Sequence, residues 1–248
     1  MRWWGLLIIG IASYLVFLIA GLPAHYTLSG LALAGVPVTA ASTSGTLWSG
    51  KAEGLRYNKM DFTAVNWQFK PLSLLQGELK YSLGLQNPGQ ELKGYAALSL
   101  LGSYVLTEYK GLLNAQHLPE LIGQPYIKTS GDLDVDIETL EIAQARVVSA
   151  KGTIRWLNAG IQSPVSAQLG GLEFDLKGDK AALVTDIRDI NGPLKIQGAL
   201  NLKPDGQYRL SGKVKPTASA DPALARALRN FGRAAADGNI LIEYTGQL

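Results

Sequence analysis

Hydrophobic residues form one unbroken run at the start of the chain, whereas later they alternate with polar ones. The run extends from Trp3 to Leu22, twenty residues without a charged side chain. A helix rises ~1.5 Å per residue, so about 20 apolar residues cross the ~30 Å hydrocarbon core of a bilayer. The pattern predicts a transmembrane helix, with Trp3 and Trp4 at one headgroup layer and Pro23 ending the span.

The charges beside this run predict its orientation. Arg2 precedes it, and the next Lys or Arg on the other side is Lys51. Because short flanking segments rich in basic residues stay in the cytoplasm, we expect a cytoplasmic N-terminus and a chain that lies outside the cytoplasm after Leu22. Leu22 and Pro23 stand where a cleavage site needs small residues, which favours an uncleaved signal anchor over a removed signal peptide.

A charge-free stretch continues beyond the run, through residues 23–50. Leu28 to Ala41 is apolar but too short to cross a bilayer, and Gly30, Gly35 and Pro37 interrupt it. We expect a short helical or irregular lead-in near the membrane surface, followed by a strand. The chain then divides into residues 1–22 as cytoplasmic tip and anchor, residues 23–44 as lead-in, and residues 45–248 as a β-rich domain.

From Gly45 onward, apolar and polar residues alternate. In Glu78 to Gln86 every odd-numbered residue is Leu or Tyr and the others are polar or Gly, as in a strand with one buried face. The same alternation recurs at residues 132–137, 172–177, 194–203 and 208–215. Turn-forming residues lie between such runs at Asn87-Pro88-Gly89, Gly178-Asp179, Asn191-Gly192 and Pro204-Asp205-Gly206. Antiparallel hairpins paired in chain order are therefore predicted.

One amphipathic helix is predicted near the C-terminus. Asp221-Pro222 provides an N-cap acceptor and a Pro at the first helical position, and Gly238 is expected to end the helix. Leu224, Leu228, Phe231 and Ala235 fall on one helical face, and Arg226, Arg229 and Arg233 fall on the opposite one. Because a final strand, Ile240 to Tyr244, follows, we expect the helix to cover the apolar face of the sheet.

Composition agrees with a β-rich fold. The chain has 28 Gly, only 17% charged residues and no Cys, so no disulfide framework is available. The net charge of +3 is spread along the chain, which argues against nucleic-acid binding. The predicted fold is all-β: a single N-terminal transmembrane helix followed by a curved antiparallel sheet or half-open barrel with short helices.

Residues with catalytic or metal-binding chemistry are sparse. The two histidines, His25 and His117, belong to none of the hydrolase, nucleotide-binding or metalloprotease motifs, so no catalytic, cofactor or metal residue is assigned. Asp132, Asp134 and Asp136 resemble part of a calcium loop. However, their spacing of two places all three on one face of a strand, and Ile137 replaces the Gly that the loop needs. We favour a solvated strand face.

Two further residue sets have alternative interpretations. Trp48, Trp67 and Trp156 lie within or beside alternating strands, so core or rim packing is favoured over ligand stacking. The face formed by Arg226, Arg229 and Arg233 is either an ordinary solvated helix face or a contact for anionic lipid or an acidic partner.

Two motifs go beyond this general β pattern. Gly45-Thr46-Leu47-Trp48-Ser49-Gly50-Lys51-Ala52-Glu53-Gly54-Leu55 and Trp67-Gln68-Phe69-Lys70-Pro71-Leu72-Ser73-Leu74-Leu75-Gln76-Gly77-Glu78-Leu79 resemble signatures of the type II secretion system protein N family. Their physical role is structural. Gly45 and Gly50 bracket a short strand whose Leu47 or Trp48 can pack inward. Pro71 begins a short helix whose Leu72, Leu74 and Leu75 are expected to close the sheet edge before Gly77.

The resemblance implies a non-enzymatic accessory of bacterial protein secretion. Its expected place is the cell inner membrane, with one span and most of the chain in the periplasm, beside the secretion platform and the outer-membrane secretin. The β architecture is also similar to that of AsmA-like and lipopolysaccharide-transport proteins. A competing hypothesis is therefore lipid binding or transfer by the apolar face of a curved sheet. No cofactor is implied, and the expected partners are secretion proteins and membrane lipid.

Overall fold

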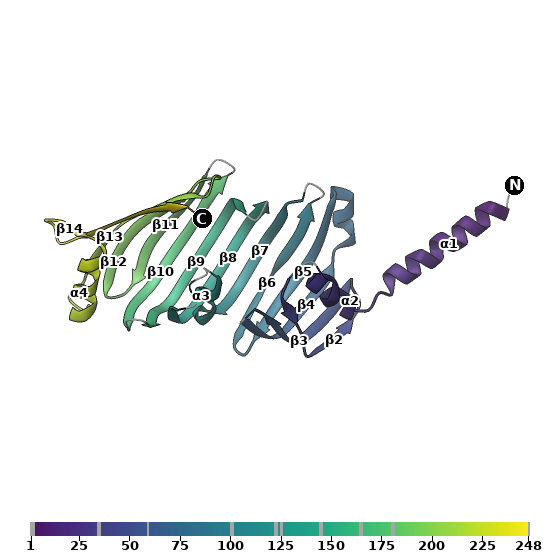
Figure 1. Ribbon diagram of the computed structural model, residues 1–248, viewed down its shortest axis with the longest axis horizontal. Helices are drawn as coiled ribbons and strands as arrows, with labels where there is room; N and C mark the ends of the chain where they lie inside the picture. Colours follow the sequence, from purple (N-terminus) through teal and green to yellow (C-terminus); the bar gives the residue numbers. More distant parts are fainter. Residues whose placement is uncertain are drawn as a thin grey trace.

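A computed structural model describes residues 3–33, 36–58, 60–99, 102–121, 124, 126–143, 146–163, 166–179 and 182–247. Within these residues, fifteen strands form one antiparallel sheet that is open rather than closed into a barrel (Figure 1). The strands follow chain order from β3 to β13, and then β15 and β14 complete the sheet. The fold class predicted from alternation is confirmed in its all-β part.

Every alternating stretch of the sequence forms a strand. The strands are β1 (Val38–Thr39), β2 (Ser42–Gly45), β3 (Ser49–Tyr57), β4 (Met60–Phe69), β5 (Glu78–Asn87), β6 (Gln90–Ser99), β7 (Tyr104–Asn114), β8 (Lys128–Ala143), β9 (Arg146–Ser163), β10 (Ala167–Asp179), β11 (Ala182–Asn191), β12 (Leu194–Leu202), β13 (Gln207–Pro216), β14 (Arg233–Ala234) and β15 (Ile240–Gln247). The predicted turns join neighbouring strands. At Pro204-Asp205-Gly206, for example, the Lys203 amide donates to the Gln207 carbonyl across the hairpin at 2.8 Å.

Apolar side chains gather on one face of this sheet because paired residues of successive strands share a face. Leu133 of β8 pairs with Trp156 of β9, which pairs with Leu172 of β10, and all three are buried. Short helices contribute to the cover over part of this face. They include η2 (Ala115–His117) and α3 (Leu118–Leu121) in the middle of the sheet, and α4 (Pro222–Phe231) near its C-terminal end.

The helix α4 confirms its predicted start and its predicted role. Leu224 is buried, and it packs with Leu228 against Leu194, Val214 and Ile242 of the sheet. Its predicted end at Gly238 is wrong, because the helix stops at Phe231. The next residue, Gly232, lies so close to β15 that an added Cβ would be 2.5 Å from the Leu241 carbonyl oxygen.

Charged side chains on the opposite face are arranged in cross-strand ion pairs. Glu173 of β10 is buried and lies between Arg155 of β9 and Arg188 of β11, both of which donate to its carboxylate. The Arg155 Nε atom lies 2.8 Å from Glu173 Oε2. Hydrogen bonds from Arg155 and then Arg188 hold the Glu173 pKa below its usual value, while burial opposes them. Of the Asp residues predicted to line a strand face, Asp134 meets Arg155 and so joins this network, whereas Asp136 forms a separate pair with Lys110.

The N-terminal segment contains two helices ahead of the sheet. Helix α1 covers Trp3–Ala20 and extends away from the sheet, and α2 covers His25–Leu33 (Figure 1). Helix α2 and the strand β1 occupy the stretch for which a short helical or irregular lead-in and then a strand were expected. Among the described residues, no helix is both long and apolar enough to cross a membrane.

Candidate functional site

The backbone of the first motif is bound to the sheet by the buried Trp67 of β4, which is the first residue of the second motif. Its indole Nε1 donates to the backbone carbonyls of Thr46 and Leu47, each at 3.1 Å. The ring lies directly over Gly50, where an added Cβ would be 2.5 Å from Trp67 Cζ2. Trp48 is half-buried, with its ring centroid 4.9 Å from that of Phe69. The core and rim packing predicted for these tryptophans is confirmed, and Trp156 is likewise buried.

The same motif holds the residues that follow α1. The Leu47 amide donates to the Leu22 carbonyl at 2.8 Å, and Thr46 forms an isolated antiparallel bridge with Pro23. Ala24 is buried in one cluster with Trp67. The exit of α1 is therefore fixed against the start of β3. Gly45, with φ of +90°, lies at the end of β2 in this junction.

The second motif forms the predicted helix but not the predicted contact. A 3₁₀ helix, η1, covers Pro71–Gln76, begins with Pro71 and ends at Gly77 in a left-handed conformation. We expected its leucines to close the sheet edge, and this is wrong. Leu72, Leu74 and Leu75 are 77%, 54% and 86% exposed. Both strands beside η1 already have paired neighbours, so its leucines have no edge to cover.

The two edges of the sheet differ. The N-terminal edge consists of β1 and β2, two short strands that both pair with β3. At the other edge, β14 pairs only with Ile240 and Leu241 of β15, and no described strand pairs with that side of β15 farther along. Natural edges are usually blocked by short strands, Lys, Pro or bulges. β15 has eight residues and contains neither Lys nor Pro.

Sequence analysis missed this open edge, which we call the β15 edge. The composition of Ile240–Gln247 was the only signal that could have indicated it. The alternating pattern identifies a strand but not which strand lies last in the sheet. The strand β14 pairs with only the first two residues of β15, so the remainder of this edge has no described partner strand.

Basic residues surround the β15 edge. Residues 1–202 contain 16 basic and 16 acidic residues, whereas residues 203–248 contain seven basic and four acidic ones, so the net charge of +3 resides in this last part. Lys213 of β13 and Arg233 of β14 pair with Leu241 from its two sides, and Arg209 pairs with Thr245. In the described part of the chain, these three basic residues form no ion pair.

The predicted basic helix face is divided between two elements. Arg226 and Arg229 are exposed on α4, and the Arg226 Nε atom donates to the Pro222 carbonyl at 3.2 Å. Arg233 belongs to β14 rather than to the helix, because α4 ends at Phe231. The three arginines therefore do not form one helical face, and only Arg233 lies beside β15.

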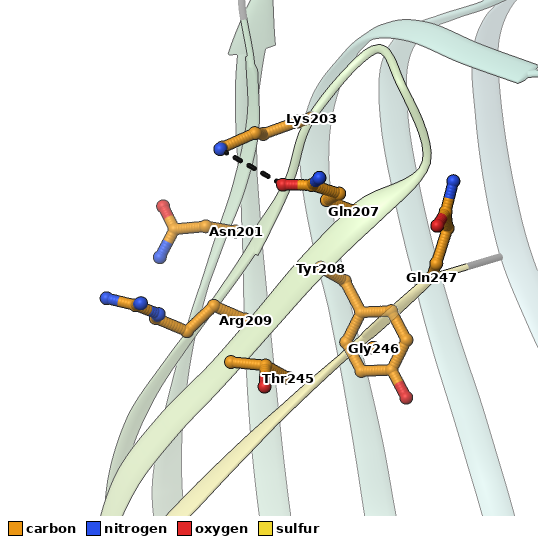
Figure 2. A pocket seen from close by; sticks show the side chains of 8 residues that line it. All are labelled: Asn201, Lys203, Gln207, Tyr208, Arg209, Thr245, Gly246 and Gln247. Atoms are coloured by element: carbon orange, nitrogen blue, oxygen red, sulfur yellow. Dashed lines mark hydrogen bonds between the residues drawn. The ribbon is translucent and has the colours of Figure 1, made fainter.

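A shallow hollow lies where β12, β13 and β15 end together (Figure 2). The Lys203 Nζ atom donates to Gln207 Oε1 at 3.3 Å, and Tyr208 lies against Gly246 of β15. The lining residues are Asn201, Lys203, Gln207, Tyr208, Arg209, Thr245, Gly246 and Gln247. They include no carboxylate and no His, so this hollow has hydrogen-bond donors but lacks an acid–base pair for catalysis.

Both histidines lie against aromatic rings. The His25 ring contacts Tyr26 with centroids 4.1 Å apart, and the His117 ring lies beside Phe62 with centroids 6.3 Å apart. Within the part of the chain that the structure describes, no three His, Cys, Asp or Glu residues are grouped so that they could hold a metal ion.

An uncovered apolar row lies on the inner face, near the strand ends that adjoin η1. Leu79 of β5 pairs with Leu98 of β6, which pairs with Tyr104 of β7. These side chains are 42%, 37% and 58% exposed. We call Leu79, Leu98 and Tyr104 the apolar row. The short helices that cover other parts of this face pack near Leu133 and Leu194 instead.

Comparison with known proteins agrees with the motifs. The family model described as Type II secretion system (T2SS), protein N matches residues 37–243. Similar relatives named Type II secretion system protein N occur in Aeromonas hydrophila, 24% identical over 96% of both chains, and in Vibrio cholerae, 26% identical over 92% of this chain and 91% of the relative. No solved structure matches the chain. Since the family model spans most of the sequence, the chain belongs to the type II secretion system protein N family.

Proposed function

We propose that this chain is a non-enzymatic accessory of the type II secretion system that binds other secretion proteins through the β15 edge. The observation that carries the proposal is the asymmetry between the two sheet edges, one blunted and one open. An extended segment of a partner can add to an open edge, because main-chain hydrogen bonds supply affinity and flanking side chains supply specificity. The surrounding Arg209, Lys213 and Arg233 favour a partner segment that carries Asp or Glu.

The proposed location is the cell inner membrane, with residues 1–22 as tip and single-span anchor. Support comes from the absence of charge between Trp3 and Leu22 and from the helical conformation of Trp3–Ala20. Residues 23–44 would be the lead-in and residues 45–248 the periplasmic domain. The platform and the outer-membrane secretin are the proposed partners.

Site-specific crosslinking in secreting cells tests the β15 edge. A photoreactive amino acid at Thr245 would lie on the β15 edge, and the same residue at Ser44 of β2 provides a matched control on the blunted edge. Both side chains are exposed. We expect an adduct with a platform subunit or the secretin from Thr245 only. Equal adducts from both positions, or none from Thr245, would contradict the proposed binding mode.

A second candidate function, lipid binding, is favoured by the apolar row. Three paired side chains at 37–58% exposure are unusual on the inner face of a sheet and would suit acyl chains. Native mass spectrometry of the full-length protein, purified in mild detergent, would detect phospholipid at a fixed ratio. Leu98→Asn should reduce that ratio, whereas Leu112→Asn, at a residue of similar exposure outside the row, should not. Unchanged lipid content in Leu98→Asn would exclude the row as the binding site.

A further inference from the structure

The leucines of η1 form a conspicuous apolar projection. Leu72, Leu74 and Leu75 are the three most exposed leucines among the described residues. They lie on one short 3₁₀ helix, so they form a convex projection rather than a groove. Exposing this much apolar surface to water is unfavourable, which suggests that the projection is covered in the working protein.

This projection is held in place by the buried Ser73. Its Oγ donates to the Lys70 carbonyl at 2.7 Å or to the Glu78 carbonyl at 2.9 Å, and accepts from the Lys80 amide at 3.1 Å. The Gly77 amide donates to the Leu74 carbonyl at 3.1 Å and completes the turn. The leucines therefore project from a fixed backbone, and their exposure is a built feature of the fold.

The projection lies at the same end of the strands as the exit of α1. The Leu22 carbonyl accepts from Leu47, and the neighbouring Trp48 carbonyl accepts from Phe69 at 2.6 Å, two residues before Pro71. Paired backbone segments are ~4.8 Å apart, so η1 begins on the order of 10 Å from the end of α1. Figure 1 shows α1 leaving the molecule at this end of the sheet.

We propose that Leu72, Leu74 and Leu75 insert into the interface of the membrane in which α1 is anchored. This inference rests on the proposed anchor and adds a second membrane contact to it. A convex apolar projection beside a membrane span matches the headgroup and acyl boundary, where apolar side chains are inserted a few Å deep. The apolar row continues the same surface, because Leu79 follows η1 directly and pairs with Leu98.

Two attachment points have a consequence that one anchor lacks. A single membrane helix leaves the whole molecule able to tilt relative to the membrane plane. Contact through η1 fixes the end of the sheet that bears Ser49, Phe69 and Glu78 against the membrane surface, and it directs the opposite strand ends away from it.

Fluorescent labelling tests this contact, and the chain is well suited to it because it contains no Cys. Single variants Leu75→Cys, Tyr126→Cys and Phe17→Cys, each carrying nitrobenzoxadiazole, would be reconstituted as full-length protein in vesicles of phosphatidylethanolamine and phosphatidylglycerol. Tyr126 is 88% exposed and lies beyond the opposite strand ends, so it is the matched control. Phe17 reports on α1 itself.

The proposal expects spin-labelled lipid to quench Leu75→Cys and Phe17→Cys but not Tyr126→Cys. Quenching at position 17 with none at position 75 would overturn the η1 contact and leave the anchor intact. No quenching at either position would overturn the anchor as well. A blue-shifted emission at position 75 without lipid quenching would mean that a protein covers the leucines, and this too would refute the membrane contact.

Discussion

Replacing Glu173 by Gln tests the ion network on the polar face of the sheet. The Glu173 side chain is 11% exposed, and the side chains of its partners Arg155 and Arg188 are 45% and 59% exposed. A hydrogen bond to a charged group contributes ~1.5–3 kcal/mol when buried, whereas an exposed ion pair contributes ~0–1 kcal/mol. The sheet is one layer thick at this face, so water screens both arginines. We therefore expect Glu173→Gln to lower the free energy of unfolding by about 2 kcal/mol at neutral pH.

The pH dependence of this loss has a definite sign. Hydrogen bonds from Arg155 and Arg188 lower the pKa of Glu173 in the folded protein. The charged form therefore stabilises the fold above the unfolded pKa of about 4.3, and the stabilisation disappears as the pH falls through the lower folded pKa. The difference between the wild-type protein and Glu173→Gln should be full at neutral pH and shrink in acid.

Urea unfolding in mild detergent, followed by tryptophan fluorescence, measures both effects. Glu138→Gln is the matched control, because Glu138 pairs with Lys151 while the two side chains are 57% and 69% exposed. Its loss should stay below about 1 kcal/mol. The reasoning is refuted if the two variants unfold at the same urea concentration, or if the loss in Glu173→Gln persists unchanged in acid.

Three further predictions concern packing and burial. Leu194→Ala should cost about 2–5 kcal/mol of unfolding free energy, because Leu194 is 1% exposed beneath α4, and a loss below that range would mean that the site collapses. Gly50→Ala should lower the melting temperature, because the added Cβ would meet the ring of Trp67. Gly30→Ala, in helix α2 where the added Cβ would meet no other group, should not lower it, and equal melting temperatures of the two variants would contradict this reasoning. Burial raises the pKa of Tyr109 to about 12, so stability should fall between the unfolded pKa of about 10 and that value. Tyr109→Phe should abolish that alkaline loss, as measured by melting temperature against pH.

Local sequence patterns were sufficient to predict most of the sheet. A strand with one buried face needs only alternation, as in Glu78 to Gln86, and a hairpin needs only suitable turn residues, as in Pro204-Asp205-Gly206. The start of α4 at Pro222 was predictable for the same reason, since capping is a property of a few adjacent residues. Each of these predictions depends on neighbours in the chain.

The features that the sequence did not reveal depend on neighbours in space. The end of α4 is set by the close approach of Gly232 to β15, a strand that comes later in the chain. Leu72, Leu74 and Leu75 have the apolar character of core residues, and only the finished sheet shows that none of the described elements covers them. The β15 edge is similarly invisible to alternation, because an edge is defined by a missing partner strand.

Because the strands pair in chain order, the sheet grows by a fixed amount with each strand that the sequence adds. Each strand from β4 to β12 contacts the strand before it and the strand after it in the sequence, so the sheet is a linear series of paired strands. Neighbouring strands are ~4.8 Å apart, so inserting one hairpin of two strands would widen the sheet by about 10 Å without disturbing the existing pairs. The distance between the α1 end and the β15 edge is therefore adjustable in evolution by whole hairpins, much as in repeat proteins. Because each strand from β4 to β12 pairs with strands adjacent to it in the chain, each strand pair can also form as soon as its two strands are available, before the C-terminal end has arrived.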